Sequence, residues 1–529
     1  MSNRPPTRGL WVLLNLLTLT TFAISQSLYQ AIVGNREFVV LNRITHGDLL
    51  LIIVVFDVLP AAVLTLLWAV VRRWRPSLAA PFLSLGYFLL LIPFALELHK
   101  KYVSPAVHFS HNTVLILIPL VIAALVVFRY RQEFDRFLLL LSPVIVLFPA
   151  MFLWRAWPEV SPVTAPPPLS MQSAAVGAQP APPIFMLVLD EFTRPALLDG
   201  HGNIDGSRFP NFARLAQQST WFNNATANAG ATTLAIPVIL TGDLPGAYDP
   251  SATYPRNLFR LLAPRYNVTI HEVETRFCTS PAYHCPDAER IESKRHLLLE
   301  VAKLYLLRIA PLSTILQLQA DELRDEQERF REFLGEIRPV AAGKPVLQFM
   351  HHELPHSPYM LTPDGAIRLR SPSSFYPELT GNREVIERLR NDYEMQLQFV
   401  DRELGAFLDA LNSAGLYDQA LVIVTADHGV SWKLNAPGRI LNDVNADMIL
   451  AIPLFIKLPG QSKPAVVSED VQSIDLLPTI AAIAGVQLPW QVDGRDIFAA
   501  HPAPRKKIAD DGNGHRYEYP EDFAAAQPH

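Results

Sequence analysis

The apolar residues of this chain are unevenly distributed, because the long apolar runs lie before residue 155. Five stretches stand out: residues 10–32, 49–71, 79–96, 113–128 and 137–154. A helix needs about 20 mostly apolar residues to cross the hydrocarbon core of a bilayer. The first two stretches are long enough, the third and fifth are at the short end, and the fourth is the shortest. The sequence therefore predicts a bundle of about five transmembrane helices over residues 1–155.

Basic residues between these stretches predict how the bundle is oriented. Cytoplasmic segments of membrane proteins carry an excess of lysine and arginine. A cytoplasmic N-terminus places eight basic residues inside and five outside, and five spans then leave everything after Trp154 outside the cytoplasm. The first stretch is unlike a cleaved signal peptide, because it is long, lacks a small-residue cleavage site and precedes four more spans. We expect a multi-pass protein of the inner cell membrane, with the lipid bilayer as a partner.

One acidic residue, Asp57, lies inside the second apolar stretch. Charged side chains within a membrane are costly and often functional. Two interpretations of Asp57 stay open at this point. It is either a functional group of the bundle or a side chain that faces a neighbouring helix or the membrane interface.

The rest of the chain divides by composition. Residues 156–182 are rich in proline and alanine and predict an extended linker. Residues 183–500 alternate between strand and helix patterns, and residues 501–529 form a polar tail that we expect to be poorly ordered. The net charge of −5 and the lack of a basic stretch with interleaved aromatic residues argue against a nucleic-acid partner.

The chain has two cysteines, Cys278 and Cys285. Two are too few for a zinc knuckle or a disulfide framework. In an oxidising compartment they can form one disulfide that closes a small loop. The alternative is a pair of free thiols.

Three apolar runs of strand length in residues 183–500 end at acids or imidazoles. They are residues 184–189, 345–350 and 420–425, and they lead into Asp190-Glu191, His351-His352 and Asp427-His428. Such runs are typical of the buried strands of a parallel sheet, whose carboxyl ends share one edge at which ligands bind. The stretch 382–411 has the 3.6-residue period of a surface-packed helix. The sequence predicts an α/β fold with a mostly parallel central sheet flanked by helices.

The side chains at this edge predict a metal site. Carboxylate oxygens together with an imidazole nitrogen suit a divalent ion. We expect one such ion, with zinc or manganese ahead of calcium. The alternative is that these acids and imidazoles are separate turn residues.

Eight segments in one order resemble the sulfatase/alkaline-phosphatase superfamily. They are residues 189–191, 209–223, 231–242, 352–359, 425–429, 452–459, 475–479 and 493–495, and the resemblance covers residues 183–498. It implies a metal-dependent enzyme acting on sulfate or phosphate esters. It also implies that Asp190, Glu191, Asp427 and His428 bind the metal, with Glu191 as a fourth ligand or a hydrogen-bond acceptor beside it.

The resemblance places the nucleophile at Thr232. Sulfatases of the main branch carry a cysteine or serine there, which is oxidised to formylglycine, whereas a threonine cannot form that aldehyde. Threonine at this position resembles the branch that transfers phosphoethanolamine or phosphoglycerol, which also has about five spans and an extracytoplasmic domain. The spacing of Thr232 and Pro237 matches that branch, and Thr233 is the adjacent alternative. A metal ion bound to the threonine would lower the pKa of its hydroxyl and align it for attack.

Three further residues are candidates for contacting the substrate. His356 is the candidate that contacts the transferred group or protonates the leaving oxygen. His352 and Lys433 are candidates for binding the anionic group, and a structural role is the alternative for each. After Asp427-His428-Gly429 the chain continues Val430-Ser-Trp-Lys433 and has no histidine before His501, which departs from the phosphoethanolamine branch.

Three hypotheses follow for the whole chain. The first is a hydrolase or transferase of phosphate-type esters that acts through Thr232 on a lipid- or glycan-linked substrate outside the cytoplasm. The second is a sulfuric-ester hydrolase without formylglycine. The third is a catalytically inert sulfatase-like protein that binds a lipid or a partner protein.

Overall fold

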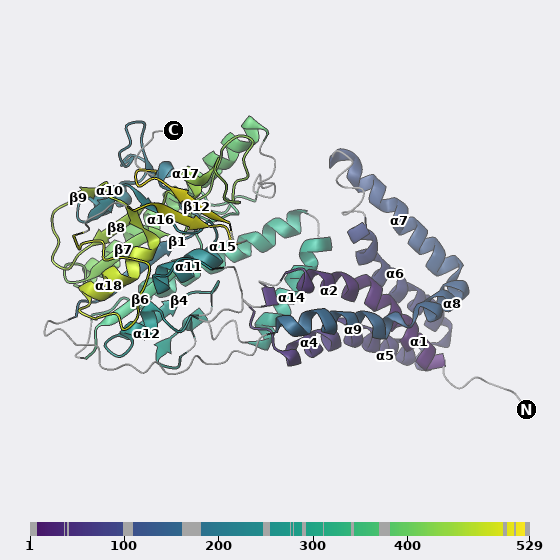
Figure 1. Cartoon of the computed structure of the whole chain (residues 1–529). Helices are drawn as coiled ribbons and strands as arrows, with labels where there is room; N and C mark the ends of the chain where they lie inside the picture. The colour runs from purple at the N-terminus through teal and green to yellow at the C-terminus, as the bar shows by residue number, and fades with distance from the viewer. Residues whose placement is uncertain are drawn as a thin grey trace, which may run out of the picture. The chain divides into compact units, whose positions relative to one another are not determined.

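A computed structural model of the chain divides it into two compact units (Figure 1). The first unit comprises Met1–Val163 and Arg290–Ile315, and the second comprises Thr164–Glu289 and Leu316–His529. The structure describes residues 8–35, 38, 39, 42–98, 109–160, 181–246, 254–275, 277, 278, 280–287, 293–309, 312–339, 343–369, 381–500, 505–512 and 515–523.

The described residues of the first unit form helices joined by short turns. These helices are α1 (Arg8–Thr20), η1 (Thr21–Ser25), α2 (Gln26–Val33), α4 (His46–Ile53), η2 (Val54–Val58), α5 (Leu59–Trp74), η3 (Pro76–Leu78), α6 (Ala79–Leu98), α7 (Phe109–Arg129), α8 (Arg131–Leu141), α9 (Val144–Ala156), η6 (Trp157–Glu159) and α14 (Lys294–Ile309). η1 and η2 are π-helical turns, so α1–η1–α2 and α4–η2–α5 are continuous helical stretches.

The described residues contain fewer helices suited to span a membrane than the five we expected. Within the described residues, Gly9–Val33, His46–Trp74 and Pro76–Leu98 are long and apolar enough to cross a bilayer. The fifth predicted stretch, 137–154, is divided between α8 and α9, which meet at a bend of 41° and give a fourth span only if they count as one. The fourth predicted stretch, 113–128, lies in α7, whose side chains before residue 119 are outside the described part.

Asp57 faces the first span. It lies in η2 with 2% of its surface exposed. Thr21 Oγ1 donates a hydrogen bond of 2.9 Å to Asp57 Oδ1, and Tyr29 OH donates one of 3.3 Å to Oδ2. The side chain therefore connects two spans through hydroxyl donors, as the second of our two interpretations requires.

Helix α14 comes from the middle of the sequence but belongs to the first unit. Its buried Leu297 and Val301 pack in one apolar cluster with residues of the first two spans and α9. Tyr305 OH donates to the backbone oxygen of Ala23 at 2.9 Å, and Lys294 Nζ lies 2.6 Å from Asp48 Oδ1. The chain thus leaves the second unit, returns to the helical bundle and leaves it again.

The second unit is built on an eight-stranded sheet in the order β5-β4-β6-β1-β7-β8-β2-β9 (Figure 1). The strands are β1 (Ile184–Leu189), β2 (Thr220–Phe222), β4 (Asn267–His271), β5 (Tyr283–His284), β6 (Val346–His352), β7 (Leu421–Ala426), β8 (Leu454–Lys457) and β9 (Ala465–Val467). β5, β4, β6, β1 and β7 run parallel, whereas β8 is antiparallel to β7 and β2. This arrangement confirms the predicted α/β fold.

Helices flank the sheet in the described part of this unit. They are η7 (Arg194–Leu197), α10 (Pro210–Ala216), α11 (Thr232–Thr241), α12 (Leu258–Leu262), most of α15 (Leu312–Gly335), α16 (Arg383–Ser413), α17 (Ala446–Ile449), η9 (Ser473–Asp475) and α18 (Leu476–Ile483). Every residue of β1 and β7 is buried, as the continuous apolar runs predicted. A short parallel pair, β3 (Ala225–Thr226) with β10 (Val471–Gln472), completes this core.

The polar C-terminal segment contains structure where we expected little order. β11 (Lys507–Asp510) and β12 (Arg516–Tyr519) form an antiparallel pair. Lys507 is 2% exposed, and its Nζ lies 3.0 Å from Asp470 Oδ1 and donates to the backbone oxygen of Asn224 at 2.7 Å. A buried lysine paired in this way holds the segment to the body of the second unit.

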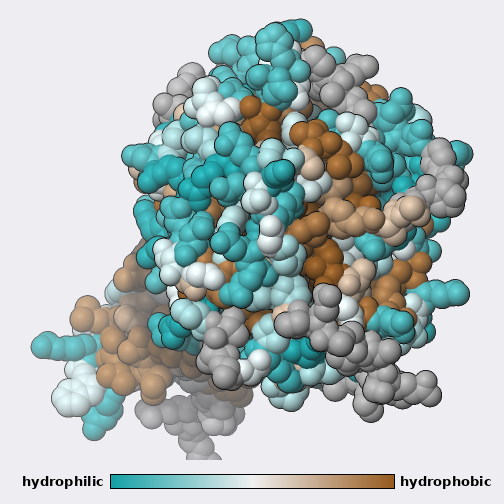
Figure 2. All heavy atoms as spheres, turned by 90° about the vertical axis from the view of Figure 1, so that its left-hand side faces the viewer, coloured by the Kyte–Doolittle hydropathy of each residue, from teal (hydrophilic) through white to brown (hydrophobic). Residues whose placement is uncertain are grey.

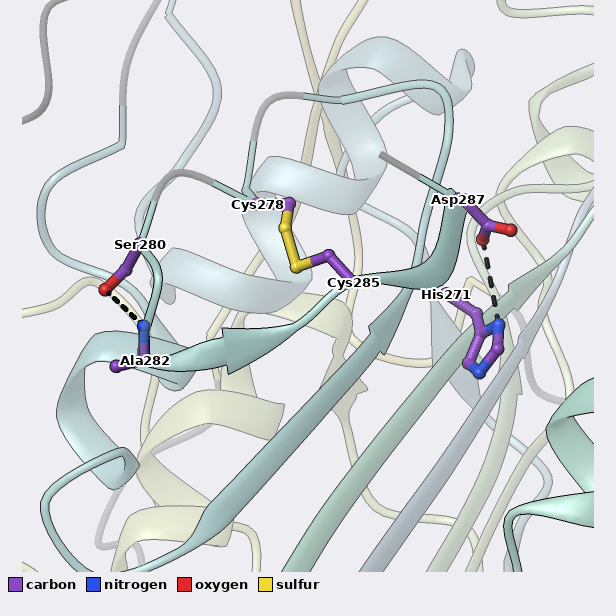
Figure 3. Close-up of a disulfide and its surroundings, with 6 residues drawn as sticks. All are labelled: His271, Cys278, Ser280, Ala282, Cys285 and Asp287. Atoms are coloured by element: carbon purple, nitrogen blue, oxygen red, sulfur yellow. Dashed lines mark hydrogen bonds and ion pairs between the residues drawn. A yellow bond between two sulfur atoms is a disulfide. The ribbon is translucent and has the colours of Figure 1, made fainter. Parts of the chain in front are cut away.

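Two local features of the second unit bear on its environment. Figure 3 shows Cys278 and Cys285 joined by a disulfide beside β5, with their Cα atoms 6.3 Å apart.

Figure 2 shows one face of the molecule on which hydrophobic side chains gather between hydrophilic ones. Among the exposed apolar residues of this unit are Ile440 and Val444, with 69% and 60% of their surfaces accessible.

Candidate active site

Strand register brings the predicted acids together. Leu189 at the end of β1 pairs with His352 of β6 on one side and with Ala426 of β7 on the other. Asp190 directly follows β1 and Asp427 directly follows β7, so both carboxylates leave the same edge of the parallel part of the sheet. This is the edge at which α/β folds bind ligands.

A compact group of possible metal ligands lies at this edge. Asp190, His351 and Asp427 are all buried, and each offers one ligand atom within 4.8 Å of the other two. Asp427 Oδ1 accepts from the backbone N–H groups of Glu191 at 3.2 Å and His428 at 2.6 Å. In contrast, Asp427 Oδ2 is buried without a hydrogen-bond partner among the described residues.

These carboxylates fit a divalent cation. Burial and the nearby charge of Asp427 raise the pKa of Asp190 well above its usual value. Two buried acids side by side are unfavourable unless a proton or a cation lies between them. The unsatisfied oxygen of Asp427 and the donor set of two carboxylates and an imidazole suit a divalent ion.

Thr232 lies beside this group, at the first residue of α11. Its Oγ1 is 3.4 Å from Asp190 Oδ1 and 3.4 Å from His428 Nε2. His428 Nδ1 lies 2.9 Å from the backbone oxygen of Gly429, which can only accept, so Nδ1 carries the hydrogen. Nε2 is the ring nitrogen that faces the Thr232 hydroxyl. Nε2 also lies 3.4 Å from Asp427 Oδ2 and 3.9 Å from Asp190 Oδ1.

Glu191, which we expected to be a metal ligand or an acceptor beside one, lies outside the group of possible metal ligands and pairs with Arg439. Its backbone has a φ of 57°, a left-handed conformation that is costly for a residue with a side chain and that clusters at functional sites. Tyr393 OH supports this turn by donating to the Glu191 backbone oxygen at 2.9 Å. The Glu191 carboxylate is fully buried and forms an ion pair with Arg439, while Tyr359 OH lies 3.4 Å from Oε2.

His356 and Arg439 form a second group next to Glu191. His356 Nδ1 lies 2.6 Å from the backbone oxygen of Ser357, so it donates, and Nε2 faces the guanidinium of Arg439. Because arginine has only donors, Nε2 accepts and the ring is neutral. Burial lowers the pKa of His356, which favours the same state, although the Glu191 carboxylate opposes the shift. Arg439 keeps 44% of its side chain exposed and can reach a bound anion.

His352 and Lys433 lie in other surroundings than those we expected for substrate ligands. Both ring nitrogens of His352 are occupied, with Nδ1 2.5 Å from Glu326 and Nε2 2.8 Å from Glu403. Lys433 Nζ lies 2.6 and 2.5 Å from the two carboxylate oxygens of Asp447. In this structure both residues therefore satisfy carboxylates of the protein.

Sequence reasoning missed two residues of this site. His351 was read only as a strand end, and nothing in a pair of adjacent histidines says which of them faces the acids. Arg439 lies in an irregular segment eleven residues beyond His428, where no spacing rule applies. The alternation of side chains along a strand did indicate that only one of the two histidines faces the acids, because adjacent residues of a strand face opposite sides of the sheet.

A sequence model of the sulfatase family matches residues 182–486, which is more than half of the chain. This chain belongs to the sulfatase family. The match confirms the resemblance carried by the eight motifs. It also means that the sulfatase domain begins directly before β1 and contains the candidate site, from Asp190 to Arg439.

Curated sulfatases match this sulfatase domain to different extents. Arylsulfatase A of Homo sapiens is 31% identical over 129 residues, which are 23% of this chain and 25% of that protein. Iduronate 2-sulfatase of Mus musculus is 23% identical over 408 residues, covering 61% of this chain and 72% of that protein. Among solved structures, the phosphonate monoester hydrolase SpPMH of Silicibacter pomeroyi has 20% identity and a TM-score of 0.46, covering 62% of this chain and 79% of that chain. The chain thus matches about a quarter of the length of human arylsulfatase A.

Proposed function

We propose that this protein is a membrane-bound, metal-dependent hydrolase or transferase that cleaves phosphate-type esters through Thr232. One observation carries the proposal: the Thr232 hydroxyl lies 3.4 Å from both Asp190 Oδ1 and His428 Nε2, beside the Asp190–Asp427 pair. A formylglycine cannot arise from a threonine. The chemistry must therefore use the hydroxyl itself, and a hydroxyl needs activation at neutral pH.

The chain's own residues divide the work. Asp190 and Asp427 would hold the ion together with imidazole nitrogens of His351 and His428. When bound, the ion supplies Lewis-acid activation of the hydroxyl and offsets charge on the ester. Asp190 Oδ1 is the acceptor within reach of the hydroxyl proton of Thr232. Arg439, held by Glu191 and His356, is the cation available to a non-bridging oxygen of the ester.

The reaction then has two steps. Thr232 Oγ1 loses its proton and bonds to phosphorus, the bond from phosphorus to the ester oxygen breaks, and the leaving oxygen takes up a proton. Water or an acceptor hydroxyl next attacks the phosphothreonine, the Oγ1–phosphorus bond breaks, and Thr232 regains its proton. Water gives hydrolysis and an alcohol gives transfer. The neutral state of His356 suits positioning Arg439, a role that differs from the acid role we first considered.

The substrate we propose is lipid- or glycan-linked, and the segment that carries Arg439 favours an amphiphilic one. Ile440 and Val444 expose most of their surfaces within five residues of that cation. Exposed apolar side chains beside a charged site suit a ligand that has an anionic head and an apolar body.

The outer side of the membrane is the proposed location of the second unit. The excess of basic residues in segments 1–9, 72–78 and 129–136 supports it. A disulfide such as Cys278–Cys285 persists in oxidising compartments, which supports the same side. Labelling intact cells with a membrane-impermeant reagent, after placing a single cysteine at Ser468 in a variant without the native pair, tests the location. Protection of that residue until the cells are lysed would contradict it.

The chemistry is tested with the full-length protein in detergent, assayed on an aryl phosphodiester and an aryl sulfate in the presence of Mn²⁺ or Zn²⁺. We expect turnover of the phosphodiester, and loss of turnover in Thr232→Ala but not in Thr233→Ala. Mass spectrometry of the Thr232 peptide after exposure to substrate should show a phosphate adduct. Turnover of the sulfate alone would favour the sulfuric-ester hydrolase instead, and no turnover with no bound metal would favour the inert binding protein.

A further inference from the structure

Strand β6 ends in two histidines that face opposite sides of the sheet. Side chains of a strand alternate between its two faces. His352 contacts Glu326 of α15 and Glu403 of α16, so it lies on the face that these helices cover. His351 lies on the other face and joins Asp190 and Asp427. The two rings share one strand end but have different partners.

Glu272 is the residue that contacts His351. His271, the last residue of β4, pairs with Met350 of β6, so the next step of the two parallel strands brings Glu272 beside His351 on the same face. Glu272 Oε2 lies 3.1 Å from His351 Nδ1, and the two side chains are 1% and 0% exposed. The other carboxylate oxygen of Glu272 is fixed by the backbone N–H of Thr275 at 2.7 Å.

This contact leaves one nitrogen of His351 available. Nδ1 lies 3.1 Å from Glu272 Oε2 in an ion-pair contact that lacks hydrogen-bond geometry, and Nε2 is buried with neither a hydrogen bond nor an ion pair in the part of the chain that the structure describes. His352 offers the opposite case, because carboxylates occupy both of its nitrogens. A buried imidazole with one nitrogen facing a carboxylate and the other open is the arrangement that orients histidines toward metal ions.

We propose that Glu272 is a positioning residue, which acts through His351 to orient the imidazole toward a divalent ion shared with Asp190 and Asp427. This inference rests on the metal site of the proposed function. Glu272 fixes the tautomer of His351, with the hydrogen on Nδ1 and the lone pair on Nε2, and its charge makes that lone pair a stronger donor. Glu272 itself is not in the group whose ligand atoms lie within 4.8 Å of one another.

The test measures metal affinity with the full-length protein in detergent, stripped with a chelator and dialysed against graded Mn²⁺ or Zn²⁺. We expect Glu272→Leu to weaken metal binding by about 10- to 100-fold. Glu272→Gln keeps an oxygen that accepts from Nδ1–H and should fall between the native protein and Glu272→Leu. Glu326→Gln is the matched control, since it alters the carboxylate partner of the neighbouring His352, and it should bind metal as the native protein does.

A double substitution shows whether Glu272 acts through His351. His351→Asn should weaken binding at least as much as Glu272→Leu, and the two changes together should be no worse than His351→Asn alone. Native affinity in Glu272→Leu, equal losses in Glu272→Leu and Glu326→Gln, or additive losses in the double variant would each overturn the role of Glu272. A native protein that binds neither ion would overturn the metal site and with it the proposed function.

Discussion

The ion pair between Arg439 and Glu191 connects the stability of the second unit to its chemistry. Arg439→Gln leaves the Glu191 carboxylate, which is fully buried, without its cation. Removing one partner of a buried pair costs about 3–5 kcal/mol. Since the arginine side chain is 44% exposed, we expect the lower end of that range, about 3 kcal/mol.

Stability and activity should respond differently when both charges are removed. Glu191→Gln together with Arg439→Gln leaves no unpaired buried charge, so most of the lost stability should return. Turnover should be about 100- to 1,000-fold below native in both Arg439→Gln and the double variant, because each lacks the cation that we propose contacts the ester. Arg439→Lys keeps the charge but loses the planar fork, and should be intermediate in turnover.

Hydrogen exchange of the peptides that contain β1 and β7, followed by mass spectrometry, reports on the second unit alone. The native protein, Glu191→Gln, Arg439→Gln, Arg439→Lys and the double variant would be compared in the same detergent, together with turnover of the aryl phosphodiester. A double variant that is as unstable as the sum of its two single variants would refute the pairing. An Arg439→Gln protein with native turnover would refute the role of this cation.

Three other predictions follow from residues already described. Burial raises the pKa of Glu326, but Arg329 and His352 outweigh burial and lower this pKa to about 2. Because the usual pKa of a glutamate is about 4, the stabilisation by Glu326 should be present above about pH 4 and disappear as the pH falls through about 2. Melting of Glu326→Gln in detergent should therefore show a deficit against the native protein at pH 6 that vanishes near pH 2. Chelation of the metal should abolish turnover. In the metal-free state, Asp427→Asn should melt at a higher temperature than the native protein, because the substitution removes one of two like charges. Ile440→Ser combined with Val444→Ser should raise KM for an amphiphilic substrate but leave KM for a small aryl ester unchanged, and equal effects on both would contradict the proposed substrate class.

The strand ends were the part of the fold that could be predicted from sequence. Continuous apolar runs are typical of strands buried on both faces of a parallel sheet, so we expected Asp190 and Asp427 to leave the same edge. The choice between His351 and His352 needed the face of β6, which depends on strand register and on the helices that cover each side. Arg439 could not be found, because its position depends on the path of an irregular segment.

The helical unit shows a different limit of sequence reasoning. Apolar length predicts how far a helix can reach, but it does not reveal a bend, and the bend between α8 and α9 divides the last predicted span. Helix α14 was also hidden, because its buried face is short and it lies among sequence that belongs to the sulfatase domain. Its partners are helices of the first unit, the farthest of them 282 residues earlier in the contact of Tyr305 with Ala23, and only packing identifies them.

The return of α14 to the helical unit determines how the two units can be separated by a protease. The chain passes between them at 163/164, 289/290 and 315/316. A single cut in the proline-rich linker leaves the sulfatase domain attached through both ends of α14, so it stays in the membrane fraction. A fragment expressed from residue 183 onward would carry Leu297 and Val301 without the apolar partners that bury them. We therefore expect that a cut in the linker releases the sulfatase domain from the helical unit only when the contacts of α14 are also lost.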